Sequence, residues 1–251
     1  MPTREEAQSV ARRLHALAGD PQILRKAAAR DLALRHPVDA NELLDHLLAL
    51  SREGWEPAGC VLSGYVAALG LEAEGIPHAE HLRRMAAVQS LAAVEALFPE
   101  GPPKLEMDPG AAAKADAKLF SESLGYLKQK ARATRDPDEL ARFVMVSNPS
   151  VVRNALLNPR LTEEWVVRIA ARRPARPEPL LEIWKSPRWS SRHAVRRALV
   201  LNPYLPPEVG AKIVPLLNQT DLAELASDGE VHPGLRYQAK LLLESSPGRK
   251  P

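Results

Sequence analysis

The chain has 251 residues, of which 45% are hydrophobic and 26% charged, with a formal net charge of +3 and a single cysteine. A chain of this size buries enough surface to fold without disulfides or metal ions, and its composition is typical of neither disordered nor fibrous proteins. It contains no apolar run of about 18 residues, and the lone Cys60 excludes an intrachain disulfide framework and a cysteine-rich zinc or iron–sulfur site.

The first residues are charged and lack the apolar core of a signal peptide. We therefore expect a cytoplasmic protein that does not enter a membrane. The sequence contains no P-loop, no dinucleotide fingerprint and no nucleophile elbow. We accordingly expect no enzymatic activity, no cofactor and no bound metal ion.

Apolar positions are mostly Ala, Leu and Val at helical spacing, which predicts an all-α protein. An N-terminal helical region, 1–98, is expected to hold helices at about 4–18, 21–35, 38–51, 57–73 and 77–98. A segment rich in Pro and Gly, 99–110, predicts a linker, and a charged connecting helix is expected within 111–135. The remaining domains are a repeat domain, 136–246, and a polar tail, 247–251.

Prolines that follow His or Asn mark expected helix boundaries. They occur at His36-Pro37, Asn148-Pro149, Asn158-Pro159 and Asn202-Pro203. The missing N–H of Pro is harmless in the first turn of a helix, and the residue before Pro avoids the helical region. Each pair is therefore expected to end one helix and begin the next.

A sequence motif recurs along the chain. It reads VRNALLNP around Arg153, VRRALVLNP around Arg196 and, in a shorter form, LRYQA around Arg236, so that its arginines lie 43 and 40 residues apart. A diverged copy, RDLALRHP, begins at Arg30 and favours diverged repeats over a separate bundle for the N-terminal region. A period near 40 residues with several short helices per unit is typical of an α-solenoid.

The segment 136–246 resembles bacterial HEAT-like repeat proteins, in particular the leucine-rich-repeat-variant group, whose units carry a similar pattern of V-R-x-A-L followed by N-P. The resemblance implies short paired helices in a right-handed α-solenoid, with a binding surface rather than a catalytic centre. Some members of that group carry an N-terminal cysteine cluster for iron–sulfur, which this chain lacks because it has one cysteine.

The strongest functional signal is a basic segment from Arg168 to Arg197, where nine basic side chains are opposed only by Glu178 and Glu182. On a helix, Arg168 and Arg172 lie on one face, away from the apolar positions, and are expected to point to solvent. The candidate residues for binding a partner or a polyanion are Arg168, Arg172, Arg173, Arg176, Lys185, Arg188, Trp189, Arg192 and Arg197.

Three functions remain open for this segment. The first is a non-enzymatic adaptor or scaffold whose repeat surface binds an acidic partner protein. The second is a nucleic-acid-binding solenoid, because arginines with interleaved aromatics suit a phosphate backbone. The third is similarity to HEAT-like DNA glycosylases, which line a basic groove with Trp, Asp and Arg; Trp184 and Trp189 are present, but no acidic partner matches a motif.

Smaller features have structural interpretations. The recurrent arginine is expected to bind helix-end carbonyls or an acidic side chain of the next unit, since repeats preserve what makes them stack. His78 and His81 lack a His-Glu-x-x-His spacing and are expected to be a surface pair. Cys60 stands among small and apolar residues and is expected to be a small buried hydrophobic side chain.

Overall fold

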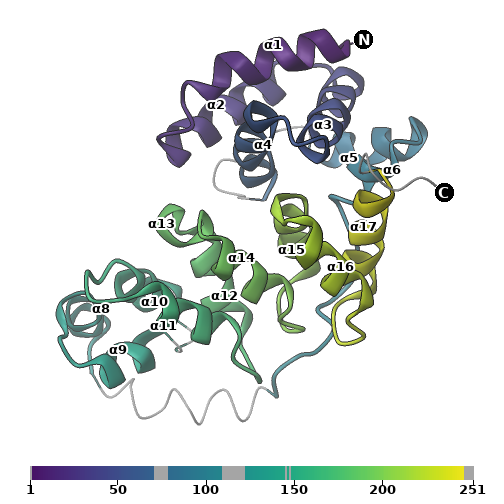
Figure 1. Ribbon diagram of the computed structural model, residues 1–251. Coiled ribbons are helices and arrows are strands. Elements are labelled where there is room, and N and C mark those ends of the chain that lie inside the picture. Colours follow the sequence, from purple (N-terminus) through teal and green to yellow (C-terminus); the bar gives the residue numbers. More distant parts are fainter. Residues whose placement is uncertain (1, 71–78, 109–121, 145, 147, 246–251) are drawn as a thin grey trace. The chain divides into compact units, whose positions relative to one another are not determined.

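The computed structural model describes residues 2–70, 79–108, 122–144, 146 and 148–245. The described residues form helices joined by turns and loops, and they contain no strand, which confirms the predicted all-α class. Its helices are α1 (Arg4–His15), α2 (Pro21–Ala33), α3 (Pro37–Arg52), α4 (Glu56–Leu69), α5 (Ala79–Val88), α6 (Ala92–Glu95), α8 (Leu124–Ala133), α9 (Pro137–Val144), α10 (Pro149–Leu156), α11 (Glu163–Ala170), α12 (Pro177–Lys185), α13 (Pro187–Ser190), α14 (His193–Val200), α15 (Pro207–Ile213), the 3-10 helix η2 (Val214–Leu216), α16 (Gln219–Ser227) and α17 (Pro233–Glu244) (Figure 1). Among the described helices, none is long and apolar enough to cross a bilayer.

Proline begins many of these helices, as predicted. Pro37 and Pro149 are the first residues of α3 and α10, and the side chain of Asn148 accepts hydrogen bonds from the backbone of Ser150 and Val151. This is the N-cap geometry in which an Asn oxygen satisfies free helical N–H groups. The predicted starts at Pro159 and Pro203 are wrong, because turns follow there and the next helices begin only at Glu163 and Pro207.

The chain divides into two compact units, which are described separately. Unit 1 comprises 1–101 and 207–251, and unit 2 comprises 102–206. The first division falls inside the predicted linker, whose described residues, 99–108, form no helix. The second division falls inside the predicted repeat domain, so that α15, η2, α16 and α17 belong to the same unit as α1 to α6.

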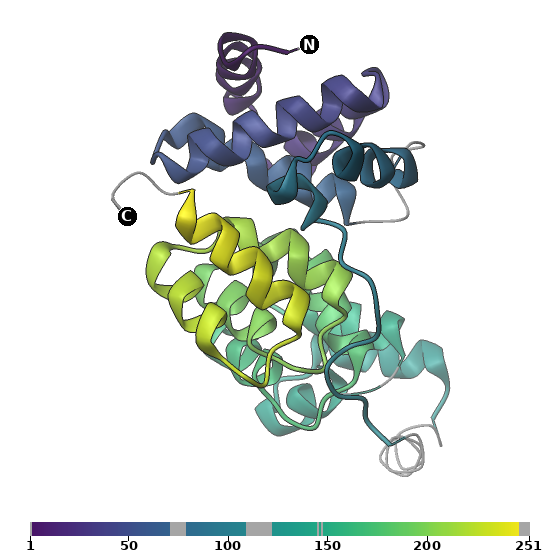
Figure 2. The same cartoon turned by 90° about the vertical axis from the view of Figure 1, so that its right-hand side faces the viewer.

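Unit 1 is built around α4, which packs against α1, α2 and α3. Figure 1 shows α1 lying across the neighbouring N-terminal helices. At Gly64, α4 approaches α2 so closely that a Cβ atom there would lie 2.7 Å from Leu24 Cγ. Further along the chain, α16 and α17 pack side by side, and α17 also contacts α15 and α6 (Figure 2). Apolar side chains, mostly Leu, Ala and Val, form the core between these helices.

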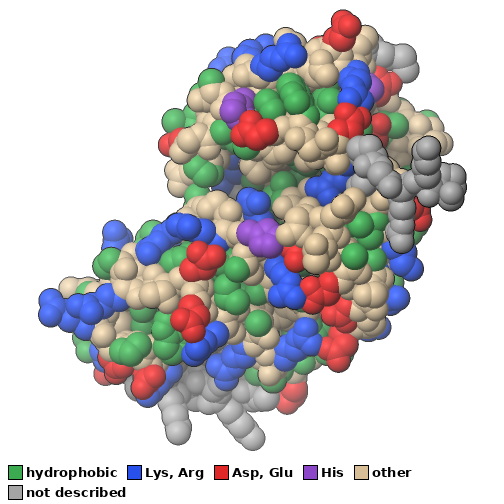
Figure 3. Space-filling view, viewed as in Figure 1, with side chains coloured by type: hydrophobic (Ala, Val, Ile, Leu, Met, Phe, Trp, Pro, Cys, Tyr) green, Lys and Arg blue, Asp and Glu red, His purple; other side chains and the backbone are tan. Residues whose placement is uncertain are grey.

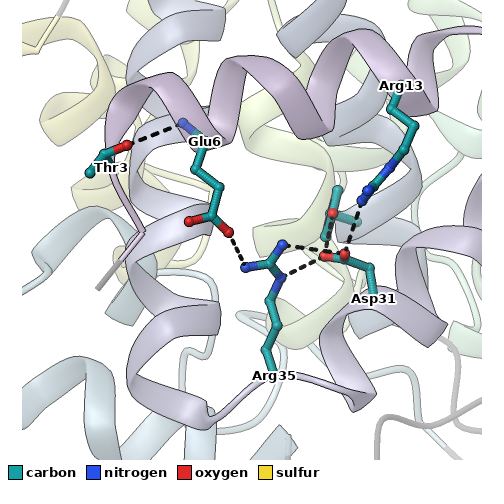
Figure 4. Close-up of polar contacts among 6 residues, drawn as sticks. Thr3, Glu6, Arg13, Asp31 and Arg35 are labelled. Carbon is teal, nitrogen blue, oxygen red and sulfur yellow. Dashed lines mark hydrogen bonds and ion pairs between the residues drawn. The ribbon is translucent and has the colours of Figure 1, made fainter.

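A polar network joins α1, α2 and α4 of unit 1. The Asp31 carboxylate accepts hydrogen bonds from Arg35 Nε at 2.8 Å and from the Tyr65 hydroxyl at 2.8 Å, and it forms an ion pair with Arg13 at 3.6 Å. Arg35 also donates to Glu6 at 3.0 Å, so that one guanidinium bridges α1 and α2 (Figure 4). Burial and the neighbouring Asp31 carboxylate raise the pKa of Tyr65 well above its usual value.

Tyr65→Phe is expected to lower the free energy of unfolding by about 1 kcal/mol, because the Asp31 carboxylate loses one of its buried donors. Chemical denaturation followed by circular dichroism measures the change. Tyr126→Phe is the matched control, since the Tyr126 side chain is exposed on α8. An unchanged stability in Tyr65→Phe would contradict a role for the hydroxyl in holding α4 to α2.

Unit 2 contains α8 to α14, and within it α8 packs on α10 and α11 packs on α14. Of the predicted charged connecting helix, the described part is α8, while 109–121 lie outside the described residues. The buried Asn158 donates from Nδ2 to the carbonyls of Ala131 and Thr134, at the end of α8. The side chain of Asn158 therefore holds two helices together. A turn follows it, and the next helix begins only at Glu163.

Asn202 repeats this arrangement one motif later. It is also buried and donates from Nδ2 to the carbonyl of Ala170, the last residue of α11, at 2.7 Å, and to that of Arg172, just beyond the helix, at 3.1 Å. The oxygen of each Asn accepts from the backbone N–H two residues later, that of Arg160 in one case and of Tyr204 in the other. The Asn of the sequence motif thus has the same structural role in both copies.

Candidate partner-binding surface

The exposed arginines of unit 2 begin on α11. Arg168 is exposed, forms an i,i+4 ion pair with Glu164 at 2.6 Å and lies over the Trp165 ring, 5.6 Å from its centroid. Arg172 is exposed just after the end of α11, and among the described residues it has no ion-pair partner. The predicted solvent orientation of both side chains is confirmed. Arg173 is exposed as well, and its Nη2 donates to the carbonyl of Leu201 at 2.6 Å.

Three further predicted residues are exposed, Lys185 and Arg197 on α12 and α14 and Arg192 at the N-cap of α14. Arg192 lies 3.8 Å from Glu163 at the start of α11, and Lys185 lies 3.7 Å from Glu182. Arg197 is exposed on α14. The acidic neighbours compensate part of the charge of this region, because an exposed ion pair in water leaves little net attraction for a third charge.

Arg188 and Trp189 both make contacts within unit 2, although Arg188 is exposed and Trp189 is buried. Trp189 is 3% exposed and donates from Nε1 to the carbonyl of Leu156 at 2.9 Å. The Arg188 guanidinium stacks 4.3 Å from the Trp189 ring centroid and donates to the carbonyls of Asn158 and Leu161. The prediction of Trp189 as a binding residue is therefore wrong: its ring fills the core and its one donor is already used.

The prediction that Arg176 belongs to the binding surface is also wrong. It is 6% exposed, at the position before Pro177 where α12 begins. The sequence places it within a run of basic residues, but the chain turns between α11 and α12 and brings this side chain inward. Arg176 is accordingly removed from the candidate surface.

A pocket of about 270 Å3 lies beside α11, and the sequence analysis missed it. It is lined by Trp165 and the apolar Leu140 and Leu161, together with two basic residues, Arg135 and Arg160, and one acidic residue, Asp136. Trp165 is half-buried, whereas Trp184 and Trp189 are 4% and 3% exposed. A signal was available, since Arg160 and Trp165 stand just before the basic segment, but the pocket itself requires α9 to pack close to α11.

The charge on unit 2 is patchy. Figure 3 shows Lys and Arg side chains over the elements of unit 2, interrupted by acidic and hydrophobic side chains. Arg135, Arg160, Arg168 and Arg172 are all exposed on this unit. These four arginines place positive charge near the pocket beside α11.

The recurrent arginine shows two of the predicted structural contacts. Arg153 donates from Nε to the buried Glu182 carboxylate at 2.9 Å, which links α10 to α12. Arg196 is largely buried and donates from Nε to the Ser190 carbonyl at 2.6 Å, at the end of α13. Burial lowers the pKa of Arg196 to about 10. By contrast, Arg30 is exposed, so its copy of the motif lacks this burial.

Arg196→Ala is expected to lower the thermal stability of the protein, by about 2 kcal/mol in the free energy of unfolding, because packing and a carbonyl hydrogen bond are both lost. Arg197→Ala, at the neighbouring exposed position, is the control and should change stability by less than about 0.5 kcal/mol. Differential scanning calorimetry of both variants decides the question. Equal melting temperatures for Arg196→Ala and the wild type would show that the recurrent arginine does not stabilise this copy.

Unit 1 holds a buried lysine. Lys212 of α15 is 3% exposed, donates from Nζ to the carbonyl of Leu97 and lies 4.4 Å from the Phe98 ring centroid. Burial lowers the pKa of Lys212 to about 7, and the charge of Glu208 opposes this shift. The contact joins the C-terminal helices of unit 1 to the segment that follows α6.

A second pocket in unit 1, of about 650 Å3, is lined by α5, α6 and α17 residues of mixed character, among them Arg83, Glu95 and Tyr237. Arg83 is paired with Glu100 at its rim. Because opposite charges are already paired there, this pocket attracts neither an anionic nor a cationic ligand in particular.

Comparison of the chain with protein-family models, with curated proteins and with solved structures gives no match.

Proposed function

We propose that the protein is a non-enzymatic cytoplasmic adaptor built of HEAT-like helical repeats arranged as an α-solenoid, and that unit 2 binds an acidic segment of a partner protein. The equivalent roles of Asn158 and Asn202 support the repeat interpretation, because each ties the end of its motif to the carbonyls of an earlier helix. The recurrent packing of α8 on α10 and of α11 on α14 agrees with it.

The observation that carries the binding proposal is the pocket beside α11. Trp165 supplies a half-buried aromatic wall, and Arg135 and Arg160 supply charge at the same place. Tryptophan and arginine are the residues that most often carry binding energy at protein interfaces. An aliphatic or aromatic side chain of the partner fits the apolar part, and neighbouring carboxylates pair with the guanidinium groups.

Nucleic acid is the second candidate, because Arg168 and Arg172 lie exposed on the same helix and its continuation. One observation favours a protein partner. The interleaved Trp184 and Trp189, which would stack on bases, are buried in the core. The same burial of Trp184 and Trp189 weighs against a HEAT-like DNA glycosylase.

The test compares two variants that change the net charge equally. The first, Arg135→Glu with Arg160→Glu, reverses the charge at the pocket; the second, Lys26→Glu with Lys240→Glu, reverses exposed lysines of unit 1. Native co-purification from nuclease-treated lysate should yield a defined protein with the wild type and with the unit 1 variant. The pocket variant should lose it by at least tenfold.

Fluorescence anisotropy with labelled single- and double-stranded DNA and RNA distinguishes the alternative. Submicromolar binding that weakens steeply with salt and disappears when Arg168 and Arg172 are both replaced by Glu would place nucleic acid first. Equal recovery of the partner protein by both variants would contradict the proposed surface. Melting temperatures of both variants establish that each is folded before binding is compared.

A further inference from the structure

Three potential metal ligands of different chemistry meet in unit 1, whereas the proposed binding surface belongs to unit 2. His15 is the last residue of α1, Glu56 is the first residue of α4, and Cys60 lies one turn further along α4. Glu56 and Cys60 are four residues apart and so project from the same helical face. His15 and Glu56 are separated by 41 residues, so their meeting depends on the packing of α1 on α4.

The donor atoms of these side chains are already in contact. His15 Nε2 lies 3.1 Å from Glu56 Oε1 and 3.0 Å from Oε2, and the Cys60 thiol donates to Glu56 Oε1 at 3.2 Å. One ligand atom from each side chain can be chosen so that all three lie within 4.8 Å of one another. Around a tetrahedral zinc ion, with ligand bonds of about 2.0–2.3 Å, such atoms are roughly 3.3–3.8 Å apart, so small side-chain rotations complete the geometry.

The surroundings of Cys60 suit a metal ligand better than a nucleophile. A nucleophilic cysteine needs its base or a positive charge beside the sulfur, whereas here the carboxylate of Glu56 stands between the thiol and the imidazole. Burial and the Glu56 carboxylate raise the pKa of Cys60. Cys60 is also half-exposed, which corrects its expected role as a buried hydrophobic side chain and leaves a path for an ion to enter.

We propose that His15, Glu56 and Cys60 form a binding site for zinc, with a water molecule at the fourth coordination position. An imidazole, a carboxylate and a thiolate together suit Zn2+ better than Mg2+ or Ca2+, which bind through oxygen. On binding, the Cys60 thiol releases one proton to solvent and its sulfur bonds to the metal, so that thiolate and carboxylate balance the charge of the ion. The bound metal then ties the end of α1 to the start of α4.

Titration of the chelator-treated full chain with Co2+ tests the site directly, because Co2+ accepts the same tetrahedral ligands and absorbs light. One equivalent should produce a sulfur-to-cobalt charge-transfer band in the near ultraviolet together with strong visible d–d bands, and Zn2+ should abolish both. Cys60→Ser should lose the charge-transfer band, and His15→Gln should weaken Co2+ binding at least tenfold. Zn2+ should also raise the melting temperature of the wild type, since it binds only the folded state.

His81→Gln is the matched control, since His81 is an exposed histidine of α5. The other member of the predicted surface pair, His78, lies outside the described residues. This variant should bind Co2+ as the wild type does. The melting temperatures of the metal-free variants verify folding, and Cys60→Ser should keep that of the wild type because Ser can replace the hydrogen bond to Glu56. A Co2+ spectrum without a charge-transfer band, or one that survives Cys60→Ser, overturns the proposal, and so does equal loss of binding in His81→Gln.

Discussion

Replacement of Lys212 by Met is expected to remove most of the increase in unit 1 stability between pH 7 and pH 9. In the folded protein burial lowers the pKa of Lys212 to about 7, whereas in the unfolded chain the same group titrates near its ordinary value of about 10.4. Between these two values the unfolded state binds one more proton than the folded state. The free energy of unfolding therefore rises with pH across this window, by up to about 1.4 kcal/mol per pH unit.

The sign at low pH follows from the same linkage. Below about pH 7 both states carry the proton, so the folded state bears the full cost of a buried ammonium group. In Lys212→Met this cost is absent, although the carbonyl of Leu97 loses its donor at every pH. The variant is therefore expected to be the more stable form at pH 6 and to lose that advantage by pH 9, where the wild type has gained about 2–3 kcal/mol.

Urea denaturation at several pH values from 6 to 9, followed by circular dichroism, provides the two curves. Lys240→Met is the matched control, because Lys240 is an exposed lysine of α17 in the same unit, and it should follow the wild-type pH dependence. The upper limit of pH 9 avoids the ordinary titration of tyrosines and other lysines. Parallel curves for the wild type and Lys212→Met would show that Lys212 keeps its charge in the folded protein.

Asn202→Ala is expected to lower the free energy of unfolding of unit 2 by about 2–4 kcal/mol. The substitution removes the donor to the carbonyls of Ala170 and Arg172 and the acceptor for the backbone of Tyr204, and the site is 3% exposed. Buried backbone groups left without a partner cost more than the deleted bonds alone. Asn202→Asp should be at least as damaging, because its carboxylate would face two carbonyl oxygens.

Asn158→Ala provides the decisive comparison, since Asn158 makes the same contacts in the other copy of the motif. Its cost should match that of Asn202→Ala within about 1 kcal/mol. Asn154→Ala is the control: Asn154 is half-buried and donates within its own helix to Ser150, so its loss should cost less than about 1 kcal/mol. A large cost at one motif Asn and a small cost at the other would contradict their structural equivalence.

The helical class and most helix positions could be predicted from the sequence, because they depend on local chemistry. The single helix expected at about 77–98 is wrong, since the chain forms α5 and α6 there with a turn between them. Pro37 and Pro149 begin helices as expected, and the side chain of Asn148 caps one of them. The same local rule failed at Pro159 and Pro203, where the preceding Asn donates to carbonyls 24 and 30 residues earlier in the chain. A long-range contact there overrides the local preference.

The candidate surface was predicted in part for a similar reason. Helical spacing correctly placed Arg168 and Arg172 in solvent, since the apolar face of one helix identifies its opposite face. The burial of Arg176 and Trp189 depends on how the chain turns between helices, which spacing within a helix does not describe. The Trp165 pocket likewise exists only because α9 and α11 pack together.

The sequence by itself determined that this is a helical protein with a recurrent Val-Arg and Asn-Pro motif and a concentration of arginine near its second copy. Only the tertiary structure decided which of those arginines are available to a partner. It also brought His15 to Glu56 and Cys60, and Lys212 to the carbonyl of Leu97, across 41 and 115 residues. Periodicity specifies which face of a helix is buried, but the identity of the groups facing it depends on packing between distant segments.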